Sequence, residues 1–460
     1  MNTPIADFVR GYEKQNMTRL HMPGHKGKAF LGCEALDITE VSGADTLYEA
    51  EGIIAESEAN ATRLFGTGRT IYSTEGSSQC IRAMLYLCME KFYASLQYTS
   101  QQCTSHDCVM VKPTVLATRN VHKAFVYAAA LLDLEVEWIL PEGDMHSLCS
   151  CNVTASEIEK KLQEMEKPPI AVYVTSPDYL GGELNIKGIA DVCHKFGTIL
   201  AVDNAHGAYM HFLNPSRHPI DMGADICCDS AHKTLPVLTG GAYLQIGKNA
   251  PESFARNAKQ AMALFGSTSP SYLILASMDL CNQYLENGYR ERLVDAVDKL
   301  QEVRKTLMEK RWRVLEADPL KLTICVPKGL TGIELADKLR LHDVECEYAD
   351  KNYVVCMATP ENTEEDLQKL CNALGENKLD YEMEITFQKL NCKKKMSIRE
   401  SIFAEHEVIS TSESLGRICG SPTVSCPPAI PVVISGEVID EEAVAILEYY
   451  GIQTIDVVKE

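Results

Sequence analysis

Residues 224–233 read Ala-Asp-Ile-Cys-Cys-Asp-Ser-Ala-His-Lys, and this stretch gives the first indication of the fold. Its apolar part, Ala224 to Cys228, predicts a short buried strand. Thr234-Leu235-Pro236 follows, where a proline hinders the continuation of a regular element. We therefore expect Lys233 to lie at the end of a core strand, beside His232 and several hydroxyl groups. A lysine in such a setting loses its proton more readily than a solvated one, and its neutral amine can form a Schiff base with an aldehyde.

A second apolar segment, about thirty residues upstream, ends in a carboxylate. Residues Thr198 to Val202 predict a strand, and Asp203-Asn204-Ala205-His206-Gly207 follows it. Pyridoxal phosphate needs such a pair, with a lysine to hold its aldehyde and a carboxylate to keep its pyridine nitrogen protonated. Asp203 alone could be a turn or helix-cap residue. Its pairing with Lys233 favours the cofactor.

Two further segments suit the phosphate and the ring of that cofactor. Residues 71–79 combine a strand, a glycine turn and the serines Ser77 and Ser78, and they precede a helix predicted over 80–92. Backbone N–H groups and hydroxyls at a helix start bind phosphate. His122, which follows the apolar run 114–117, is the candidate to cover the face of the ring. Taken alone, it would be interpreted as a structural histidine.

Several motifs occur together in one order along the chain. They are His21-Met22-Pro23-Gly24-His25-Lys26-Gly27, Glu75-Gly76-Ser77-Ser78, Arg119-Asn120-Val121-His122-Lys123, Asp203 to Gly207, Ser230 to Lys233, Phe265 to Tyr272, Ser414 to Ile418, Cys426 to Pro431, and Gly436-Glu437. In this arrangement the chain resembles the Orn/Lys/Arg decarboxylase family of fold type I pyridoxal phosphate enzymes. It is most similar to the short bacterial form, which lacks an N-terminal receiver-like wing.

The resemblance implies an α/β fold with an aspartate aminotransferase-like large domain, a mainly parallel seven-stranded sheet and smaller α/β C-terminal domains. The alternation of strands and helices from about 70 to 285 independently favours a sheet covered on both faces. We expect an irregular N-terminal arm at a dimer interface, a large cofactor-binding domain, a linker helix with a small α/β domain, and a C-terminal domain. Their expected ranges are 1–50, 51–288, 289–375 and 376–460.

The resemblance also implies an activity and a set of site residues. The reaction would be decarboxylation of arginine, lysine or ornithine to an amine and CO2, feeding polyamine metabolism. The catalytic residues would be Lys233, His232, Asp203 and His122. The residues that bind pyridoxal phosphate would be Ser77, Ser78, His122, Asp203, His206, Ser230, His232, Lys233, Ser267 and Thr268. Because Ser267 or Thr268 would reach the phosphate of a neighbouring subunit, the resemblance implies a homodimer or higher homo-oligomer with shared active sites.

The substrate pocket is where the sequence departs from the family pattern. Glu437 matches the family's Pro-Gly-Glu motif and could bind a cationic side chain, or it could be an ordinary exposed glutamate. His25 and Lys26 of the arm are further candidates for substrate contact. Ser435 stands where the family has proline. The chain also has Cys426 where the family commonly has tyrosine, Ala429 where it has glycine, and Asn204 where glutamate is frequent. The choice among arginine, lysine and ornithine stays open, as does a smaller or non-cationic amino acid.

Two alternatives remain beside the decarboxylase. One is another fold type I activity, an aminotransferase or a lyase acting on a different amino acid. An aminotransferase usually clamps the α-carboxylate with an arginine of its small domain, yet the last 140 residues contain only Arg340, Arg399 and Arg417. The other is a non-catalytic protein that binds cofactor or polyamine. The presence of both Lys233 and Asp203 argues against it, because a binding module needs neither.

Composition narrows the classes of partner and compartment. The net charge of -20 argues against nucleic acid and anionic membranes as partners. The chain has no apolar run of transmembrane length and no apolar signal core near its start, so we expect a cytoplasmic protein. Its 18 cysteines include no Cys-x-x-Cys pair. We expect no metal site, not even at His146 to Cys151, and interpret the thiols as small reduced hydrophobes.

Overall fold

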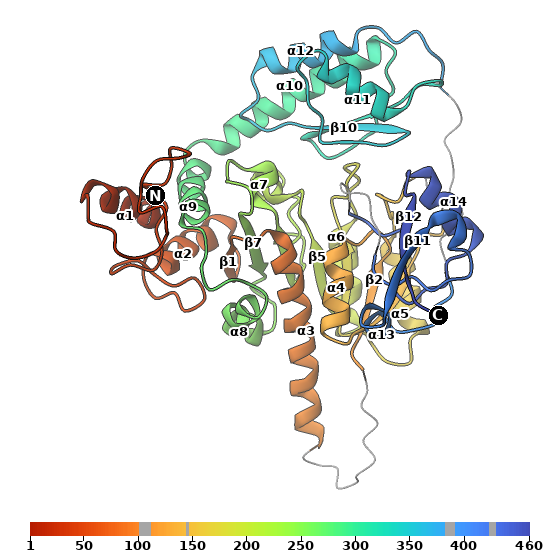
Figure 1. Cartoon of the computed structure of the whole chain (residues 1–460), viewed down its shortest axis with the longest axis horizontal. Coiled ribbons are helices and arrows are strands. Elements are labelled where there is room, and N and C mark those ends of the chain that lie inside the picture. The colour runs from red at the N-terminus through yellow and green to blue at the C-terminus, as the bar shows by residue number, and fades with distance from the viewer. Residues whose placement is uncertain (101–111, 144–146, 382–391, 423–428) are drawn as a thin grey trace. The chain divides into compact units, whose positions relative to one another are not determined.

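A mainly parallel sheet of seven strands is the largest element of the fold, which confirms the predicted α/β class (Figure 1). Its strands follow the order β1-β7-β6-β5-β4-β2-β3. The structure is a computed structural model of the chain. It describes residues 1–100, 112–143, 147–381, 392–422 and 429–460. Contacts divide the chain into two units, and each is described by itself.

The first unit comprises residues 1–109 and 186–291. Its strands are β1 (Arg69–Ser73), β5 (Ile199–Asp203), β6 (Ile226–Asp229) and β7 (Ala242–Ile246). Strands β5 and β6 run parallel, with Asp203 opposite Cys228, whereas β7 runs antiparallel to both β6 and β1. Strands β5, β6 and β7 are buried along their whole length. This agrees with their continuous apolar runs, which are typical of a sheet that is covered on both faces.

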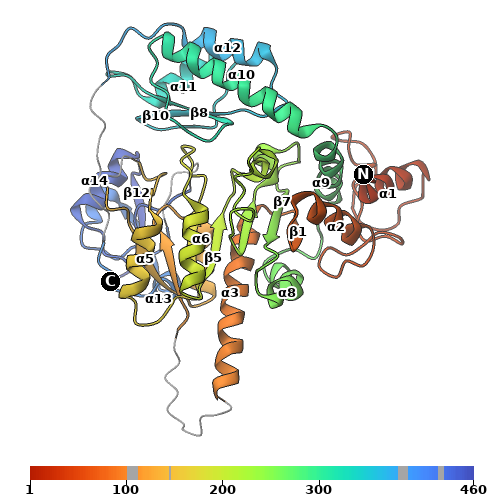
Figure 2. The same cartoon turned by 180° about the vertical axis from the view of Figure 1, so that it is seen from behind.

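Helices surround these strands (Figures 1 and 2). They are α1 (Pro4–Lys14), α2 (Ile53–Phe65), α3 (Ser77–Ser100), α6 (Ile186–Lys195), α7 (Ala231–Thr234), α8 (Glu252–Ala263) and α9 (Tyr272–Glu286), with a 3-10 helix η1 (Ala208–Phe212). Helix α3 packs across β1, β5, β6 and β7. It starts three residues before the predicted helix over 80–92 and continues beyond it, so both Ser77 and Ser78 lie in its first turn.

Residues 1–50 were expected to be irregular, and this prediction is wrong for Pro4–Lys14, which form α1. The helix buries Ile5 and Val9 in this unit. Its first turn has no side-chain cap from Thr3; instead Asp279 of α9 accepts hydrogen bonds from the backbone of Ile5 at 2.9 Å and Ala6 at 3.0 Å. The cap therefore comes from a residue far away in the sequence, and no local pattern could have indicated it.

The second unit comprises residues 110–185 and 292–460 and supplies the other strands of the large sheet. These are β2 (Thr114–Thr118), β3 (Glu135–Ile139) and β4 (Ala171–Thr175), with the helices α4 (Lys123–Leu131) and α5 (Ala155–Glu164) between them. Strand β2 is parallel to both β3 and β4. Because crossover connections between parallel strands are right-handed, α4 and α5 cover opposite faces of these strands.

A separate three-stranded antiparallel sheet of order β8-β10-β9 follows, within the range 289–375 where we expected a linker helix and a small α/β domain. Its elements are β8 (Lys321–Cys325), α11 (Gly332–Arg340), β9 (Tyr348–Ala349), β10 (Tyr353–Met357) and α12 (Glu364–Leu374). The linker helix expected at the start of this range is α10 (Tyr289–Glu309). Its apolar side packs Leu300 and Leu307 against this sheet, in one core cluster with residues of α11 and α12.

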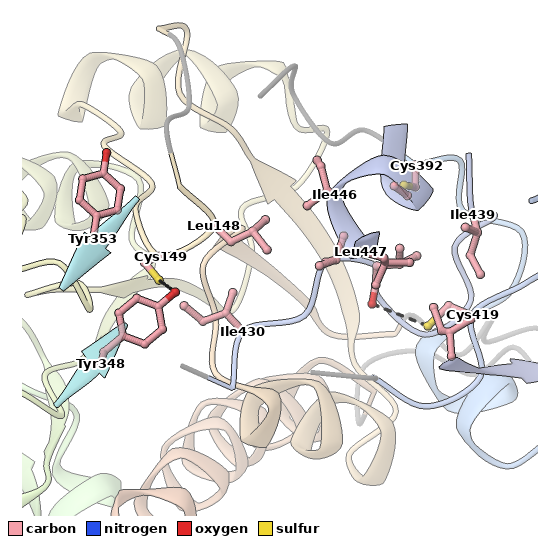
Figure 3. Close-up of a cluster of buried hydrophobic side chains, with 14 of the residues drawn as sticks. Leu148, Cys149, Tyr348, Tyr353, Cys392, Cys419, Ile430, Ile439, Ile446 and Leu447 are labelled. Atoms are coloured by element: carbon pink, nitrogen blue, oxygen red, sulfur yellow. Dashed lines mark hydrogen bonds between the residues drawn. The ribbon is translucent and has the colours of Figure 1, made fainter. Parts of the chain in front are cut away.

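The last part of the chain, still within the second unit, forms a smaller α/β subdomain. It contains α13 (Ile398–Ile402), β11 (His406–Ser410), a 3-10 helix η2 (Thr411–Glu413), α14 (Glu441–Tyr449) and β12 (Thr454–Val458), and β11 pairs antiparallel with β12. Figure 3 shows its core continuing to the three-stranded sheet, where the thiol of Cys149 donates to the Tyr348 hydroxyl at 3.8 Å. Ile430 and Leu447 belong to the same buried cluster.

The cysteines in the described ranges form no disulfide, and most of them are buried. Burial raises the pKa of the Cys193 thiol to about 12, so this thiol stays protonated at neutral pH. This agrees with the interpretation of the cysteines as small hydrophobes. His146 and Cys426, which the sequence analysis singled out, lie outside the described residues. Among those that are described, no helix is both long and apolar enough to cross a membrane.

One carboxylate fixes the tip of the N-terminal arm. Glu34 accepts hydrogen bonds from the backbone N–H groups of Leu31 at 2.5 Å, Phe30 at 2.8 Å and Gly32 at 2.9 Å. These donors favour the charged form, so they lower the pKa of Glu34 to about 2, with the Leu31 bond as the main cause. The loop at 30–34 is therefore held by a single ionised side chain.

Replacing Glu34 by glutamine should loosen this loop. Since the folded pKa lies below the ordinary value of 4.5, the stabilisation is complete above about pH 4.5 and is lost as pH falls toward 2. We expect the amides of residues 30–32 to exchange hydrogen at least about tenfold faster in Glu34→Gln at pH 7. Glu49→Gln, which alters an exposed carboxylate of the same arm, is the matched control. Equal exchange in both variants would contradict the prediction.

Candidate active site

Lys233 lies where the sequence predicted, just beyond the end of β6. It stands in the short helix α7, and its Nζ is 2.9 Å from Nε2 of His206. Asp203 is the last residue of β5 and is 3% exposed. Because β5 and β6 are parallel neighbours, Lys233, His206 and Asp203 all emerge at the same edge of the sheet.

The carboxylate of Asp203 is oriented by its neighbours. Its Oδ1 accepts a hydrogen bond from the backbone of Ala205 at 3.2 Å and from the thiol of Cys228 at 3.5 Å. Burial and the adjacent Asp203 charge raise the pKa of the Cys228 thiol well above its ordinary value. The thiol therefore remains a donor to Asp203, a contact that the sequence analysis did not foresee.

The serine turn before α3 meets the loop that follows Lys233. The hydroxyl of Ser230 donates to that of Ser77 at 2.8 Å, and the backbone N–H of Gly76 donates to the carbonyl of Gly240 at 2.7 Å. Gly240 has a φ of +101°, and a Cβ there would lie 2.8 Å from the carbonyl oxygen of Thr74. Only glycine allows this approach, so two hydroxyls and the start of a long helix are brought beside the Lys233 segment.

A buried carboxylate beneath this edge was missed from the sequence. Asp229, fully buried at the end of β6, accepts from Asn204 at 2.6 Å and from Gln245 of β7 at 3.0 Å. His218 Nε2 lies 3.1 Å from its second oxygen. Cys227 is close enough to complete a three-residue group of the type that can hold a metal, but Asp229 already bonds to three side chains. We therefore interpret these residues as a structural network, in which Asp229 links the ends of three strands.

The other predicted cofactor residues have the following surroundings. Nδ1 of His232 lies 2.8 Å from the carbonyl oxygen of Gly241. His122 belongs to the second unit, where it caps α4 by accepting from the backbone of Ala124 at 3.1 Å. Ser78 is half-buried in the first turn of α3. Their roles toward a cofactor stay predictions.

Among the residues expected at a subunit interface, Ser267, Thr268 and Lys26 are exposed in the single chain and His25 is half-buried. The backbone N–H of Ser267 bonds to the side chain of Glu75, and Thr268 beside it is exposed. His25 forms a hydrogen bond with Asp37 at 3.1 Å, while Lys26 bonds to a backbone carbonyl of the arm. The contacts of these arm residues are thus local, and their roles toward substrate stay predictions.

Glu437 is buried rather than exposed, and it is paired with an arginine of the chain itself. Its Oε2 accepts from Nη2 of Arg119 at 2.8 Å and from the backbone of Ile434 at 2.8 Å. Burial raises the pKa of the Glu437 carboxyl, and the Arg119 charge opposes this rise. Arg119 stands in the motif that was quoted for His122, so its position was visible in the sequence but its partner was not. Whether Glu437 also contacts substrate stays a prediction.

Comparison with family models gives a match over most of the chain. Residues 3–323 match the model described as "Orn/Lys/Arg decarboxylase, major domain", and residues 377–455 match "Orn/Lys/Arg decarboxylase, C-terminal domain". The chain belongs to the Orn/Lys/Arg decarboxylase family. The resemblance noted in the sequence is therefore confirmed.

Individual relatives agree with this family. The arginine decarboxylase of Halalkalibacterium halodurans is 28% identical over 96% of this chain and 92% of its own length. Lysine decarboxylase A from Pseudomonas aeruginosa has the same fold, with a TM-score of 0.79 at 17% identity over 99% of this chain and 80% of that one. The serine palmitoyltransferase of Sphingomonas wittichii aligns with a TM-score of 0.54 at 12% identity, over 80% of this chain and 82% of that one. The fold type I assignment is confirmed by these structures.

The Arg119–Glu437 pair gives a prediction for this member of the family. Arg119→Met should destabilise the second unit by about 3–5 kcal/mol, because it leaves Glu437 buried without its partner charge. The double variant Arg119→Met with Glu437→Leu should recover a large part of this loss. Urea unfolding followed by Trp138 emission in a Trp312→Phe background reports locally, because the Arg119 guanidinium lies 5.1 Å from the Trp138 ring. Equal unfolding of the single variant and the parent would refute the pairing as a stabilising contact.

Proposed function

We propose that this family member is a pyridoxal phosphate-dependent decarboxylase with arginine as its substrate. The observation that carries the proposal is the convergence of Lys233, His206 and Asp203 at one edge of the sheet. The choice of arginine rests on the relatives that match nearly the whole chain, among which the proteins from Halalkalibacterium halodurans and Bacillus subtilis are named arginine decarboxylase. The product would be the corresponding amine, a polyamine precursor.

The residues present fit pyridoxal phosphate. A lysine amine and a buried carboxylate stand on neighbouring strands, and the hydroxyls of Ser77 and Ser230 lie together beside the start of α3. A phosphate is stabilised at such a helix start by backbone N–H groups and hydroxyl donors. A Cβ at Gly76 would meet no atom within 4 Å, so the turn itself is open. When bound, the cofactor supplies an electron-accepting ring that stabilises the charge left on the substrate α-carbon.

The residues of the chain then have separate tasks. Lys233 would hold the aldehyde, and its Nζ or a ring nitrogen of His232 would return a proton to the α-carbon after CO2 has left. Asp203, held by Cys228 and Ala205, would keep a proton on the pyridine nitrogen. Ser77, Ser78, Ser230 and His232 would bind the phosphate. His122 would stack on the ring, and His206 would orient the amine of Lys233.

An aminotransferase is less well supported by the second unit. The three arginines in the last 140 residues of the chain already have protein partners. Arg340 bonds to Asp337 and Glu345, Arg399 to backbone carbonyls of α4, and Arg417 to Glu407 and the backbone of Val458. None of the three is available to clamp a substrate carboxylate without losing these contacts. This supports the decarboxylase over the aminotransferase.

We also propose a homodimer in which each active site takes Ser267 or Thr268 from the partner copy. The N-terminal arm supports this proposal, because it exposes several large apolar side chains. Their exposed fractions are 56% for Met17, 91% for Leu20, 66% for Met22, 83% for Phe30 and 89% for Leu31. Large apolar side chains exposed in such number along one short segment favour an interaction surface. A second copy of the chain is the partner that the expected sharing of active sites requires.

The cytoplasm is the compartment that we propose for this enzyme. The support is that the cysteines in the described ranges form no disulfide and are mostly buried, which suits a reducing environment.

A direct test incubates the purified protein with pyridoxal phosphate and each of the twenty amino acids, and measures CO2 and amine. We expect CO2 from arginine, with lysine and ornithine turned over more slowly. Keto acid without CO2 would instead establish an aminotransferase. CO2 from lysine alone would leave the reaction class intact and correct the substrate.

Variants of the central pair test their roles. Lys233→Ala should lose both CO2 release and the visible absorption band of the cofactor–lysine imine. Asp203→Asn should retain that band, but its turnover should fall by about 10²–10⁴-fold, because a buried charge partner contributes about 3–5 kcal/mol. Ser277→Ala, which alters a serine on α9, is a matched control. Near-normal turnover in Asp203→Asn would refute its role at the ring nitrogen.

Subunit mixing tests the shared site. Lys233→Ala and Thr268→Asp protomers, each inactive alone, are unfolded together and refolded in equal amounts. In a shared site, half of the dimers are mixed and contain one site with both intact residues, so we expect about a quarter of the parent activity. Mixing without refolding is the control. No recovery despite verified mixed dimers would show that each site is built from one chain.

A further inference from the structure

The second unit contains a cavity of its own. None of the residues of the first unit that we assigned to the cofactor line it. It has a volume of about 450 Å³. Apolar side chains form much of its wall, and they are Leu134, Val136, Leu140, Met396, Ile398 and Ile434. The Arg119–Glu437 pair and the ring of Trp138 also line it. This volume lies within the range of sites that bind small molecules.

Two buried polar atoms at this cavity have no hydrogen-bond partner in the part of the chain that the structure describes. They are Nη1 of Arg119 and Oγ of Ser435, on side chains of residues that are 3% and 2% exposed. Nη2 of Arg119 is fully engaged, because it bonds to Glu437 and to the carbonyl of Val432. Buried polar groups are normally paired, since leaving one unpaired costs about 1–3 kcal/mol. The two atoms therefore indicate a ligand that accepts hydrogen bonds.

The charge of the cavity indicates the sign of that ligand. Four cationic residues line it against two acidic ones, and they are Arg119, Lys161, Lys393 and Lys394 against Glu137 and Glu437. Glu437 is already paired with Arg119, and Glu137 lies 3.8 Å from Lys161. Lys394 bonds to Glu135, which does not line the cavity, so the excess positive charge rests on Lys393. Lys393 belongs to the segment 392–396, which forms part of the cavity wall, and its side chain is exposed. A cationic excess is unusual in a chain of net charge -20, and it attracts anions locally.

We propose that this cavity binds a small organic anion that carries a carboxylate or phosphate group on an apolar body. Arg119 Nη1 and Ser435 Oγ donate to the anionic oxygens, Lys393 adds a second positive charge, and the apolar wall with Trp138 contacts the body. Ser435 stands at a position where the family has proline. A proline has no hydroxyl to donate, so the site belongs to this chain rather than to the shared family pattern.

The test uses the holoenzyme, with pyridoxal phosphate at saturation so that the cofactor site cannot take the probe. Phenyl phosphate and benzoate are titrated separately by calorimetry, and the two probes distinguish a phosphate from a carboxylate head group. The same titrations are followed by tryptophan emission in a Trp312→Phe background, where Trp138 is the only remaining indole. A signal from Trp138 locates the probe in this cavity.

We expect at least one probe to bind with one equivalent per chain and to change the Trp138 emission. Ser435→Ala and Lys393→Ala should each weaken that binding by about tenfold, because each removes a donor or a charge from the anion. Lys395→Ala, an exposed lysine two residues along the same peptide that does not line the cavity, should bind as the parent does. The visible band of the cofactor should stay unchanged throughout.

The proposal is overturned if neither probe changes the Trp138 emission, or if both Ser435→Ala and Lys393→Ala bind as tightly as Lys395→Ala. These readouts need no amino acid substrate, so they stand whether or not the proposed decarboxylation is correct. Circular dichroism of each variant verifies that the second unit is folded before binding is compared.

Discussion

The parallel pairing of β5 with β6 is the constraint on which the site depends. Asp203 faces Cys228 across this pair, so the loops after both strands leave the sheet at one edge. This places the His206 ring within hydrogen-bond distance of the Lys233 amine. A shift of the register by one residue would turn Asp203 to the other face of the sheet and separate the carboxylate from the lysine loop. Burial of both strands on two faces makes such a shift costly.

Below this edge, the carboxylate of Asp229 fixes the ends of three strands at once. It receives hydrogen bonds from Asn204 after β5 and from Gln245 on β7, while His218 lies against its other side. The arrangement also gives a reason for the departure at position 204. A glutamate there would bring a second buried carboxylate toward Asp229, and two like charges in a buried site repel. Asn204 offers a donor to Asp229 instead, while its own Oδ1 is buried and has no hydrogen-bond partner among the described residues.

The second unit shows how the family motifs acquire meaning through contacts. The motif that contains His122 also contains Arg119, whose partner Glu437 is 318 residues away. Ala429, where the family has glycine, adopts a φ of +60° while its carbonyl accepts from Lys123 at 2.9 Å. A left-handed alanine costs about 1–2 kcal/mol. The buried surroundings of Ala429 hold this left-handed backbone conformation in place.

From the amino-acid sequence alone we could predict the fold class, the family resemblance, and the residues that converge at the carboxyl ends of β5 and β6. Those features follow from short apolar runs and from motifs whose geometry is local. Three contacts could not be predicted in this way, because they join distant parts of the chain. Asp279 caps α1, Arg119 pairs with Glu437, and Asn204 bonds to Asp229. The physical reason is that a buried polar group must find a partner, and the folded chain brings that partner from any distance along the sequence.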